Sequence, residues 1–206
     1  MDKREYFDSL ASDWDNYAQS KDATAKRAQF VTLATEAGPS RILDVGCGTG
    51  VLVPALLGQC PSATIVELDI SAQMIARNRA KNNRANIQFL CSSLSEAPLE
   101  PESFDAILCF NALPHFDIEK ALAKSAELLK PGGRIAIGHL ICSDELNAFH
   151  SLLDAPVAQD RLPAAGELSK MLSRTALTVL RCEERPDWYF VLAEKPPKRC
   201  ETPFGG

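Results

Sequence analysis

The sequence predicts a doubly wound α/β fold, in which a mostly parallel sheet of seven strands carries helices on both faces. Short apolar runs alternate along the chain with segments of helical periodicity. One such run, residues 42–45, is followed by three glycines at alternate positions and then by a helical run. Residues 177–182 and 188–193 are two further apolar runs, joined through Arg185 and Pro186, and they predict a terminal hairpin.

Composition places the chain among ordinary globular proteins. It has 206 residues, of which 46% are hydrophobic and 24% charged, so one domain with a substantial core is expected. The formal net charge of −5 gives no overall attraction to nucleic acid or to an anionic membrane. We therefore expect neither nucleic acid nor a membrane as a partner.

The cysteines indicate a reducing compartment. There are seven of them, an odd number, and no two have the Cys-x-x-Cys spacing of a zinc or redox pair. The first residues are charged and are not followed by the apolar stretch of a signal peptide, and no apolar run approaches membrane-spanning length. The expected location is the cytoplasm.

Helical periodicity, capping residues and Pro-Gly breaks give the other elements. The expected helices are 3–18, 22–37, 51–57 and onward, 71–81, 117–129, 143–154 and 164–176, with Asp22, Ser71 and Asp117 as N-caps. The other expected strands are 63–69, 86–90, 104–111 and 134–140. The organisation is one domain, divided into a helical cap (1–38), a cofactor-binding core (39–140), an inserted lid segment (141–163), the last helix and hairpin (164–197) and a tail (198–206).

The glycine-rich stretch 46–50 is the strongest local signal in the chain. Asp44 stands near the end of the first strand, and Gly46, Gly48 and Gly50 follow it. Glycine is needed where a ligand approaches the backbone so closely that a Cβ would obstruct it. A strand, a glycine loop and a helix in succession indicate a nucleotide-cofactor site.

The spacing of the glycines distinguishes between cofactors. A dinucleotide fingerprint requires its third glycine at position 51, which is Val51. S-adenosylmethionine carries no phosphate but has a sulfonium and an ammonium group, which an acid such as Asp44 suits. Asp69 lies nineteen residues after Gly50, at the end of the second strand, where it can hold a ribose diol.

With these features, residues 6–195 resemble the class I S-adenosylmethionine-dependent methyltransferases of the small-molecule type, which have a Rossmann-like fold. The resemblance includes the glycine loop and three later blocks, residues 68–74, 104–115 and 128–134. It implies that the terminal hairpin supplies a single antiparallel strand. It also implies that the segment around Trp14 and Asp15 is a cap that closes over the methionine end of the cofactor.

The loop and the resemblance together identify the residues expected to bind the cofactor. Ser93 departs from the family pattern, because an aspartate usually contacts the adenine at this position, and Met74 has core packing as an alternative role. Asn111 is expected beside the methyl-bearing sulfur. The full set is Asp44, Gly46, Cys47, Gly48, Asp69, Ile70, Met74, Ser93, Leu94 and Asn111.

The leading functional hypothesis is methyl transfer to a small-molecule acceptor. Only Asn111 and a displaced Pro114 match the motif of enzymes that methylate nucleic-acid amino groups, which argues against that class. The alternative is a non-catalytic S-adenosylmethionine-binding regulatory or partner module. A nicotinamide oxidoreductase is disfavoured by Val51. The cap and the segment 141–163 are too short to enclose a macromolecule, and the sequence leaves the acceptor and the oligomeric state open.

The three histidines of the chain are the candidate catalytic residues. His115 follows the fourth strand, His139 ends the fifth, and His150 lies on the inserted helix, so all three map to one rim of the sheet. We expect a polar cluster that orients or deprotonates the acceptor, with Asn147 and Asp160 as possible partners. Two alternatives are histidines packed against backbone carbonyls, and a bound divalent metal.

Overall fold

The structure is a computed structural model that describes residues 1–18, 21–153 and 155–198. A seven-stranded sheet forms its centre, in the order β3-β2-β1-β4-β5-β7-β6. Only β7 runs antiparallel to its neighbours β5 and β6, so the predicted parallel sheet with a terminal hairpin is confirmed. The strands are β1 (Arg41–Val45), β2 (Thr64–Asp69), β3 (Ile87–Cys91), β4 (Phe104–Phe110), β5 (Leu129–His139), β6 (Thr178–Arg185) and β7 (Trp188–Glu194).

Helices cover both faces of the sheet, as the doubly wound prediction requires. The helices are α1 (Lys3–Leu10), α2 (Lys21–Thr35), α3 (Val53–Gln59), α4 (Ala72–Asn82), α5 (Ile118–Leu128), α6 (Ser143–Ser151) and α7 (Ala165–Arg174), with short 3-10 helices at Trp14–Ala18 and Leu113–His115. One buried cluster joins α2 and α3 to the sheet through Phe30 and Leu56. Another joins α5 and α7 to the opposite face through Leu122 and Leu168.

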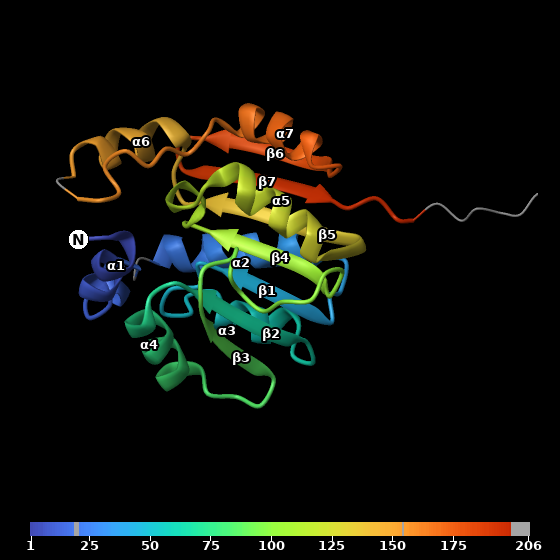
Figure 1. The fold of residues 1–206 in the computed structure, drawn as a ribbon, viewed down its shortest axis with the longest axis horizontal. Coiled ribbons are helices and arrows are strands. Elements are labelled where there is room, and N and C mark those ends of the chain that lie inside the picture. Colours follow the sequence, from blue (N-terminus) through green and yellow to red (C-terminus); the bar gives the residue numbers. More distant parts are fainter. Residues whose placement is uncertain (19–20, 154, 199–206) are drawn as a thin grey trace, which may run out of the picture.

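The carboxyl ends of the parallel strands form one edge of the sheet, which we call the carboxyl edge. In Figure 1 the arrowheads of β4, β5 and β6 point toward the side where α1 and α6 lie, whereas β7 points away from it. Elements far apart in the sequence therefore meet at the edge where ligands bind in open α/β sheets. None of the helices in the described ranges is long and apolar enough to cross a membrane.

Two of the three predicted caps are confirmed, and the first predicted helix is interrupted. Ser71 accepts a hydrogen bond from Met74 N, and Asp117 accepts one from Lys120 N. The helix predicted over residues 3–18 breaks after Leu10 and resumes as the 3-10 helix at Trp14–Ala18. Ser12 and Asp13 occupy the break, and such side chains favour local hydrogen bonds over a helix interior.

Other boundaries also differ from the prediction, three of them in ways that bear on the site or the sheet. α2 starts one residue early, so Asp22 lies in its first turn and pairs with Lys26 instead of capping it. β5 starts at Leu129 and runs through the Pro-Gly-Gly break, with a register shift against β4. The helix predicted over 143–154 ends at Ser151, and residue 154 and nearly all of the predicted tail lie outside the described residues.

Candidate functional site at the carboxyl edge

The glycine loop between β1 and α3 adopts a backbone that favours glycine at all three positions. Gly46, Gly48 and Gly50 have φ angles of 70°, 54° and 81°. A Cβ on Gly46 would lie 2.6 Å from the Cβ of Ala112, and one on Gly50 would overlap the side chain of Asn78. The loop is therefore held tightly against neighbouring elements, and larger residues would displace it.

Asp69 ties the end of β2 to this loop. Its Oδ2 accepts a hydrogen bond of 2.9 Å from Gly48 N, and its Oδ1 accepts one of 2.8 Å from Ser71 N. Burial raises the pKa of Asp69 despite these donors. The carboxylate thus shapes the loop, and its remaining lone pairs are still free to accept hydroxyl donors.

Two more acids lie beneath the loop. Asp44 on β1 and Glu67 on β2 are paired in register, and their exposed fractions are 2% and 0%. Sequence reasoning identified Asp44 but missed Glu67, although a charged residue inside an apolar strand is itself a signal. We call Asp44, the loop 46–50, Glu67 and Asp69 the acidic half of the carboxyl edge.

The N-terminal cap lies directly on the acidic half. Asp8 of α1 accepts hydrogen bonds from Ser71 Oγ at 2.5 Å and from Gln73 N at 3.0 Å. Asp15 accepts one from Thr49 Oγ1 at 2.5 Å and pairs with Lys81 at 2.8 Å. The cap therefore contacts both the loop and α4.

Trp14 brings an aromatic ring from the cap to the loop. Its Nε1 would lie 3.4 Å from a Cβ placed on Gly48. Its ring also meets Phe7 edge-on, at 6.1 Å between ring centroids. Aromatic cap residues thus cover the middle glycine.

The other residues expected to bind the cofactor fall into two groups. Cys47, Met74 and Leu94 are buried, and burial raises the pKa of the Cys47 thiol, so that thiol is not reactive. Ile70 is half-buried beside Asp69. Met74 has an exposed fraction of 1%, which agrees with its alternative role in core packing.

Ser93 and Asn111 already have partners within the protein. Ser93 Oγ donates to Glu96 Oε2 at 2.7 Å. Asn111 follows β4 with a φ angle of 53°, and its Oδ1 accepts a hydrogen bond from Leu140 N at 3.2 Å. The exposed Asn111 side chain thus links the ends of β4 and β5, on the side of the loop where Ala112 meets Gly46.

The three histidines converge as the sequence predicts, and we call them the histidine cluster. The rings of His115 and His150 have centroids 5.3 Å apart. His139 lies at the end of β5, close enough to the other two histidines that a positive charge on either would disfavour its protonation. Its exposed fraction is 2% and its Nε2 has no hydrogen-bond partner among the described residues. Burial, more than those charges, lowers the pKa of His139 to about 3, so its ring is neutral at physiological pH.

Asp160 holds His115 in one orientation. Its Oδ2 lies 2.7 Å from His115 Nδ1, and its Oδ1 accepts a hydrogen bond of 2.6 Å from Lys3 Nζ. Burial opposes ionisation, but the hydrogen bonds from His115 and Lys3 lower the pKa of Asp160 below its usual value. The ionised carboxylate accepts a hydrogen bond from His115 Nδ1, so Nε2 is the ring nitrogen that Asp160 does not engage.

Lys3 and His150 complete the surroundings of this dyad. Lys3 also donates to the backbone oxygen of His115 at 3.1 Å, so α1 contacts the dyad directly. His150 Nδ1 lies 3.1 Å from the backbone oxygen of Asp160. Asn147 was expected to join the cluster, but its amide bonds the backbone N and O of Leu162 instead. It anchors α6 to the segment before α7.

The divalent-metal alternative is not supported. Within the described ranges, no three side chains of His, Cys, Asp or Glu are grouped so that they could hold a metal ion. The Nδ1 atoms of His115 and His150 both face oxygens of Asp160. His115 and His150 are each within hydrogen-bond distance of Asp160.

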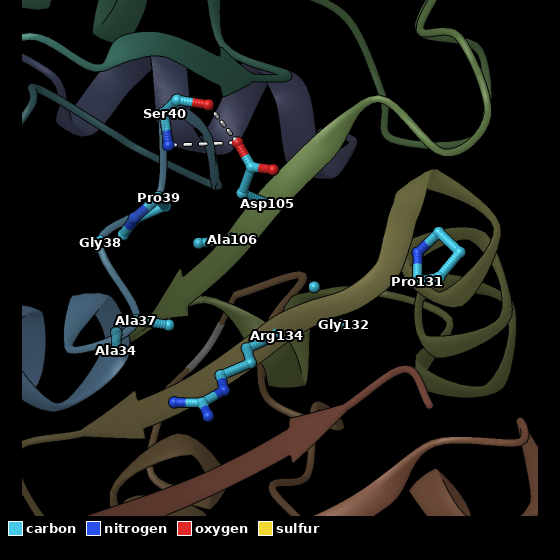
Figure 2. A pocket seen from close by; sticks show the side chains of 11 residues that line it. Ala34, Ala37, Gly38, Pro39, Ser40, Asp105, Ala106, Pro131, Gly132 and Arg134 are labelled. Atoms are coloured by element: carbon cyan, nitrogen blue, oxygen red, sulfur yellow. Dashed lines mark hydrogen bonds between the residues drawn. The ribbon is translucent and has the colours of Figure 1, made fainter. Parts of the chain in front are cut away.

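A pocket of about 220 Å³ lies at the opposite edge of the sheet, near the amino ends of β1 and β4. Figure 2 shows Asp105 bonded to the backbone and side chain of Ser40 on one side of this pocket, with Arg134 on the other. Arg134 pairs with Glu36 and Glu194. The polar side chains that line the pocket, Ser40, Asp105 and Arg134, are bonded to other groups of the protein. Because the pocket also lies away from the carboxyl edge, we assign it no function.

Comparison with known proteins agrees with this geometry. Residues 43–137 match the family described as "Methyltransferase domain". The N-methyltransferase NodS from Bradyrhizobium japonicum, solved with S-adenosyl-L-homocysteine, has the same fold, with a TM-score of 0.75 at 15% identity over 95% of this chain and 100% of that one. Residues 43–137 thus match a methyltransferase domain, and in sequence motifs and fold the chain is similar to the class I S-adenosylmethionine-dependent methyltransferases.

Curated relatives extend the sequence similarity. The ubiquinone biosynthesis O-methyltransferase of Coxiella burnetii is 30% identical over 142 residues, which are 66% of this chain and 61% of that protein. The demethylmenaquinone methyltransferase of Thermus thermophilus is 36% identical over 114 residues, or 54% of this chain and 52% of that protein. The chain thus matches between one half and two thirds of the length of these relatives.

Proposed function

We propose that this protein transfers a methyl group from S-adenosylmethionine to a small-molecule acceptor by in-line displacement. The observation that carries the proposal is the meeting of the glycine loop, three acids and a closed cap at the carboxyl edge, next to a histidine–aspartate dyad. The methyltransferase domain that residues 43–137 match and the reactions named for the relatives support it.

The acidic half is suited to the cofactor on two grounds. The glycines leave a cradle that Cβ atoms would fill, and Asp44 Oδ2 is a buried oxygen with no hydrogen-bond partner among the described residues. A buried, unpartnered acid is costly unless a cation meets it. When bound, S-adenosylmethionine supplies a methyl group that its positive sulfur has already activated for transfer.

Each residue of the acidic half has an expected task. Asp44, Gly46, Cys47 and Gly48 would receive the methionine part, and Asp69 would hold the ribose hydroxyls. The side chains expected around the adenine and the sulfur are those of Ile70, Met74, Ser93, Leu94 and Asn111. The cap, anchored through Asp8 and Asp15, would exclude water from the reacting groups.

The histidine cluster would activate the acceptor. With Nδ1 directed at Asp160, His115 can take a proton from an acceptor hydroxyl or amine through Nε2. The neutral, buried His139 offers a hydrogen bond but no charge, which suits a neutral polar group of the acceptor. Proximity and orientation at this rim account for most of the rate enhancement that a methyltransferase must supply.

The acceptor pocket would be built by the cap and the segment 141–163. Phe149 and Leu152 on this segment are 55% and 84% exposed, so its outer surface is partly apolar. One relative is named for ubiquinone biosynthesis and the other for methylating demethylmenaquinone, which is consistent with a cyclic acceptor. Neither nucleic acid nor a membrane is part of the proposal, and the reducing cytoplasm is the proposed location.

Calorimetry with S-adenosylhomocysteine tests the cofactor half of the proposal. We expect binding to the wild type and a loss of most affinity in Asp69→Ala. No binding at millimolar ligand, or undiminished binding in Asp69→Ala, would contradict it. Stabilisation of the melting temperature by S-adenosylhomocysteine but not by NAD separates the proposal from an oxidoreductase.

Turnover distinguishes an enzyme from a non-catalytic binding module. A cell extract supplied with labelled S-adenosylmethionine should yield a labelled small molecule only when the protein is added. Binding without transfer to any component of the extract would favour the regulatory module instead.

A further inference from the structure

Asp44 and Glu67 form a pair of opposed acids. They are Cα partners in the parallel register of β1 and β2, so their side chains leave the same face of the sheet. Both are buried, with exposed fractions of 2% and 0%. This pair lies directly below the glycine loop, because Asn78 contacts both Glu67 and the loop residue Cys47.

The groups that face the pair do not neutralise it. Asn78 Nδ2 donates to Glu67 Oε2 at 2.7 Å, but Glu67 Oε1 and Asp44 Oδ2 have no hydrogen-bond partner among the described residues. The charges acting on Asp44 are those of Glu67 and Asp69, both negative. The thiols of Cys47 and Cys109 are the other titratable groups beside it, and burial raises the pKa of each.

Two carboxylates buried side by side cannot both ionise without a large cost. Burial raises the pKa of Asp44, and the negative charges of Glu67 and Asp69 raise it further. Burial also raises the pKa of Glu67 to about 7, against the opposing hydrogen bonds from Asn78 and Cys47. At neutral pH the pair therefore holds a proton as long as no cation lies against it.

We infer that Asp44 and Glu67 share a proton that is released to solvent when the cationic cofactor binds, and that Glu67 thereby sets the preference for S-adenosylmethionine over S-adenosylhomocysteine. The inference rests on the proposed function. A positive sulfur and an ammonium group favour the doubly ionised pair. S-adenosylhomocysteine has lost the sulfonium charge, so it favours ionisation of the second carboxyl group less strongly.

The direction of the pH effect follows from proton linkage. A proton released on binding makes the affinity for S-adenosylmethionine rise with pH below the pKa of the free pair, by up to about tenfold per pH unit, and level off above it. The attraction between two opposite unit charges a few ångströms apart in a protein site raises binding affinity by at least about tenfold. Preference for the sulfonium should therefore weaken by roughly that factor when Glu67 is made neutral.

Calorimetry in phosphate and in Tris, which differ in ionisation enthalpy, counts the protons released. Full-length wild type, Glu67→Gln and the control Glu119→Gln are titrated with each ligand between pH 6 and 8. Glu119 is an exposed residue of α5. The amino group of the ligand titrates as well, so the measured quantity is the difference between wild type and variant.

We expect wild type and Glu119→Gln to release a fraction of a proton more than Glu67→Gln on binding S-adenosylmethionine. The ratio of the two ligand affinities should also fall about tenfold in Glu67→Gln alone. Equal proton counts and equal ratios in wild type and Glu67→Gln would overturn the inference while leaving the proposed function intact. Failure of wild type to bind either ligand would instead overturn the proposed function, and this inference with it.

A second measurement needs no variant and covers the case that Glu67→Gln does not fold. Infrared difference spectroscopy of wild type should show the band of a protonated buried carboxyl group at pH 6.5, and that band should disappear when S-adenosylmethionine binds. A free protein without the band, or a band unchanged by saturating cofactor, would refute the shared proton.

Discussion

The two halves of the carboxyl edge are built from opposite chemistry. The acidic half gathers Asp44, Glu67 and Asp69 beneath a backbone loop. The histidine cluster gathers neutral or hydrogen-bonded imidazoles around one ionised carboxylate, Asp160. The first arrangement suits a ligand that is already positive, and the second suits an acceptor that must lose a proton. The contrast supports the proposal that the cofactor and the acceptor bind at different ends of one rim.

The largest effect is expected at His115, whose replacement tests whether the two halves have separate roles. If the histidine cluster serves only the acceptor, His115→Ala should lower kcat by about 10²–10⁴-fold, the usual contribution of a general base. His139→Ala and His150→Ala should cause smaller losses. Turnover and S-adenosylhomocysteine affinity are measured for each variant, and normal turnover in all three would remove the catalytic role of the cluster.

Replacement of Asp160, the partner of His115 in the dyad, gives a second test of the same role. Asp160→Asn should approach the loss seen in His115→Ala, because an amide can stabilise the wrong tautomer of the imidazole. Asp144→Asn, on an exposed residue of α6, is the matched control. Cofactor affinity should stay within about twofold of wild type in both variants, since neither residue contacts the glycine loop. A tenfold loss of cofactor affinity in Asp160→Asn would show that the two halves are not separate.

The next largest effect is expected at the glycine loop. Gly46→Ala combines a left-handed backbone with a Cβ only 2.6 Å from that of Ala112, so we expect cofactor affinity to fall about 10–100-fold from strain of ~1–3 kcal/mol. Gly58→Ala in α3, where no atom lies within 4 Å of the added Cβ, should leave affinity unchanged. Similar calorimetric affinities in both variants would mean that the close packing of the loop is unimportant.

The free energy of unfolding, measured without ligand, tests the protonation of Glu67 independently of binding. Between pH 4.5, the ordinary pKa of Glu, and about 7, the folded state keeps a proton at Glu67 that the unfolded chain has released. The free energy of unfolding should therefore fall as pH rises through this window, by on the order of 1 kcal/mol per pH unit. Glu67→Gln should flatten that slope in urea denaturation series. An identical slope in the variant would argue that Glu67 is ionised throughout.

The smallest effect concerns the attachment of the cap. Lys81→Ala removes a half-exposed ion pair with Asp15, so cofactor affinity should fall about two- to fivefold and the loss should shrink at high salt. Arg84→Ala, an exposed neighbour just past α4, serves as the control. A larger loss at high salt than at low salt would exclude the ion pair as the cause.

The fold, and the part of the acidic half formed by Asp44, the glycine loop and Asp69, are predictable from the sequence alone. Alternation of strands and helices, the capping residues Ser71 and Asp117, and the glycine spacing between Asp44 and Gly50 are all patterns within short stretches of chain. Strand period, helix period and turn chemistry depend on near neighbours, and parallel strands bring their carboxyl ends to one edge. The convergence of three histidines could be predicted on that basis.

Which side chains meet depends on packing between elements that are far apart in the sequence. The contact between Lys3 and Asp160 joins residues 157 positions apart, and the pairing of Asp44 with Glu67 depends on the register of β1 against β2. The break after Leu10, which lets the cap fold onto the loop, and the engagement of Asn147 by Leu162 also arise from packing between distant elements. Periodicity fixes the face from which a side chain leaves its own element, whereas its partner depends on how elements far apart in sequence pack together.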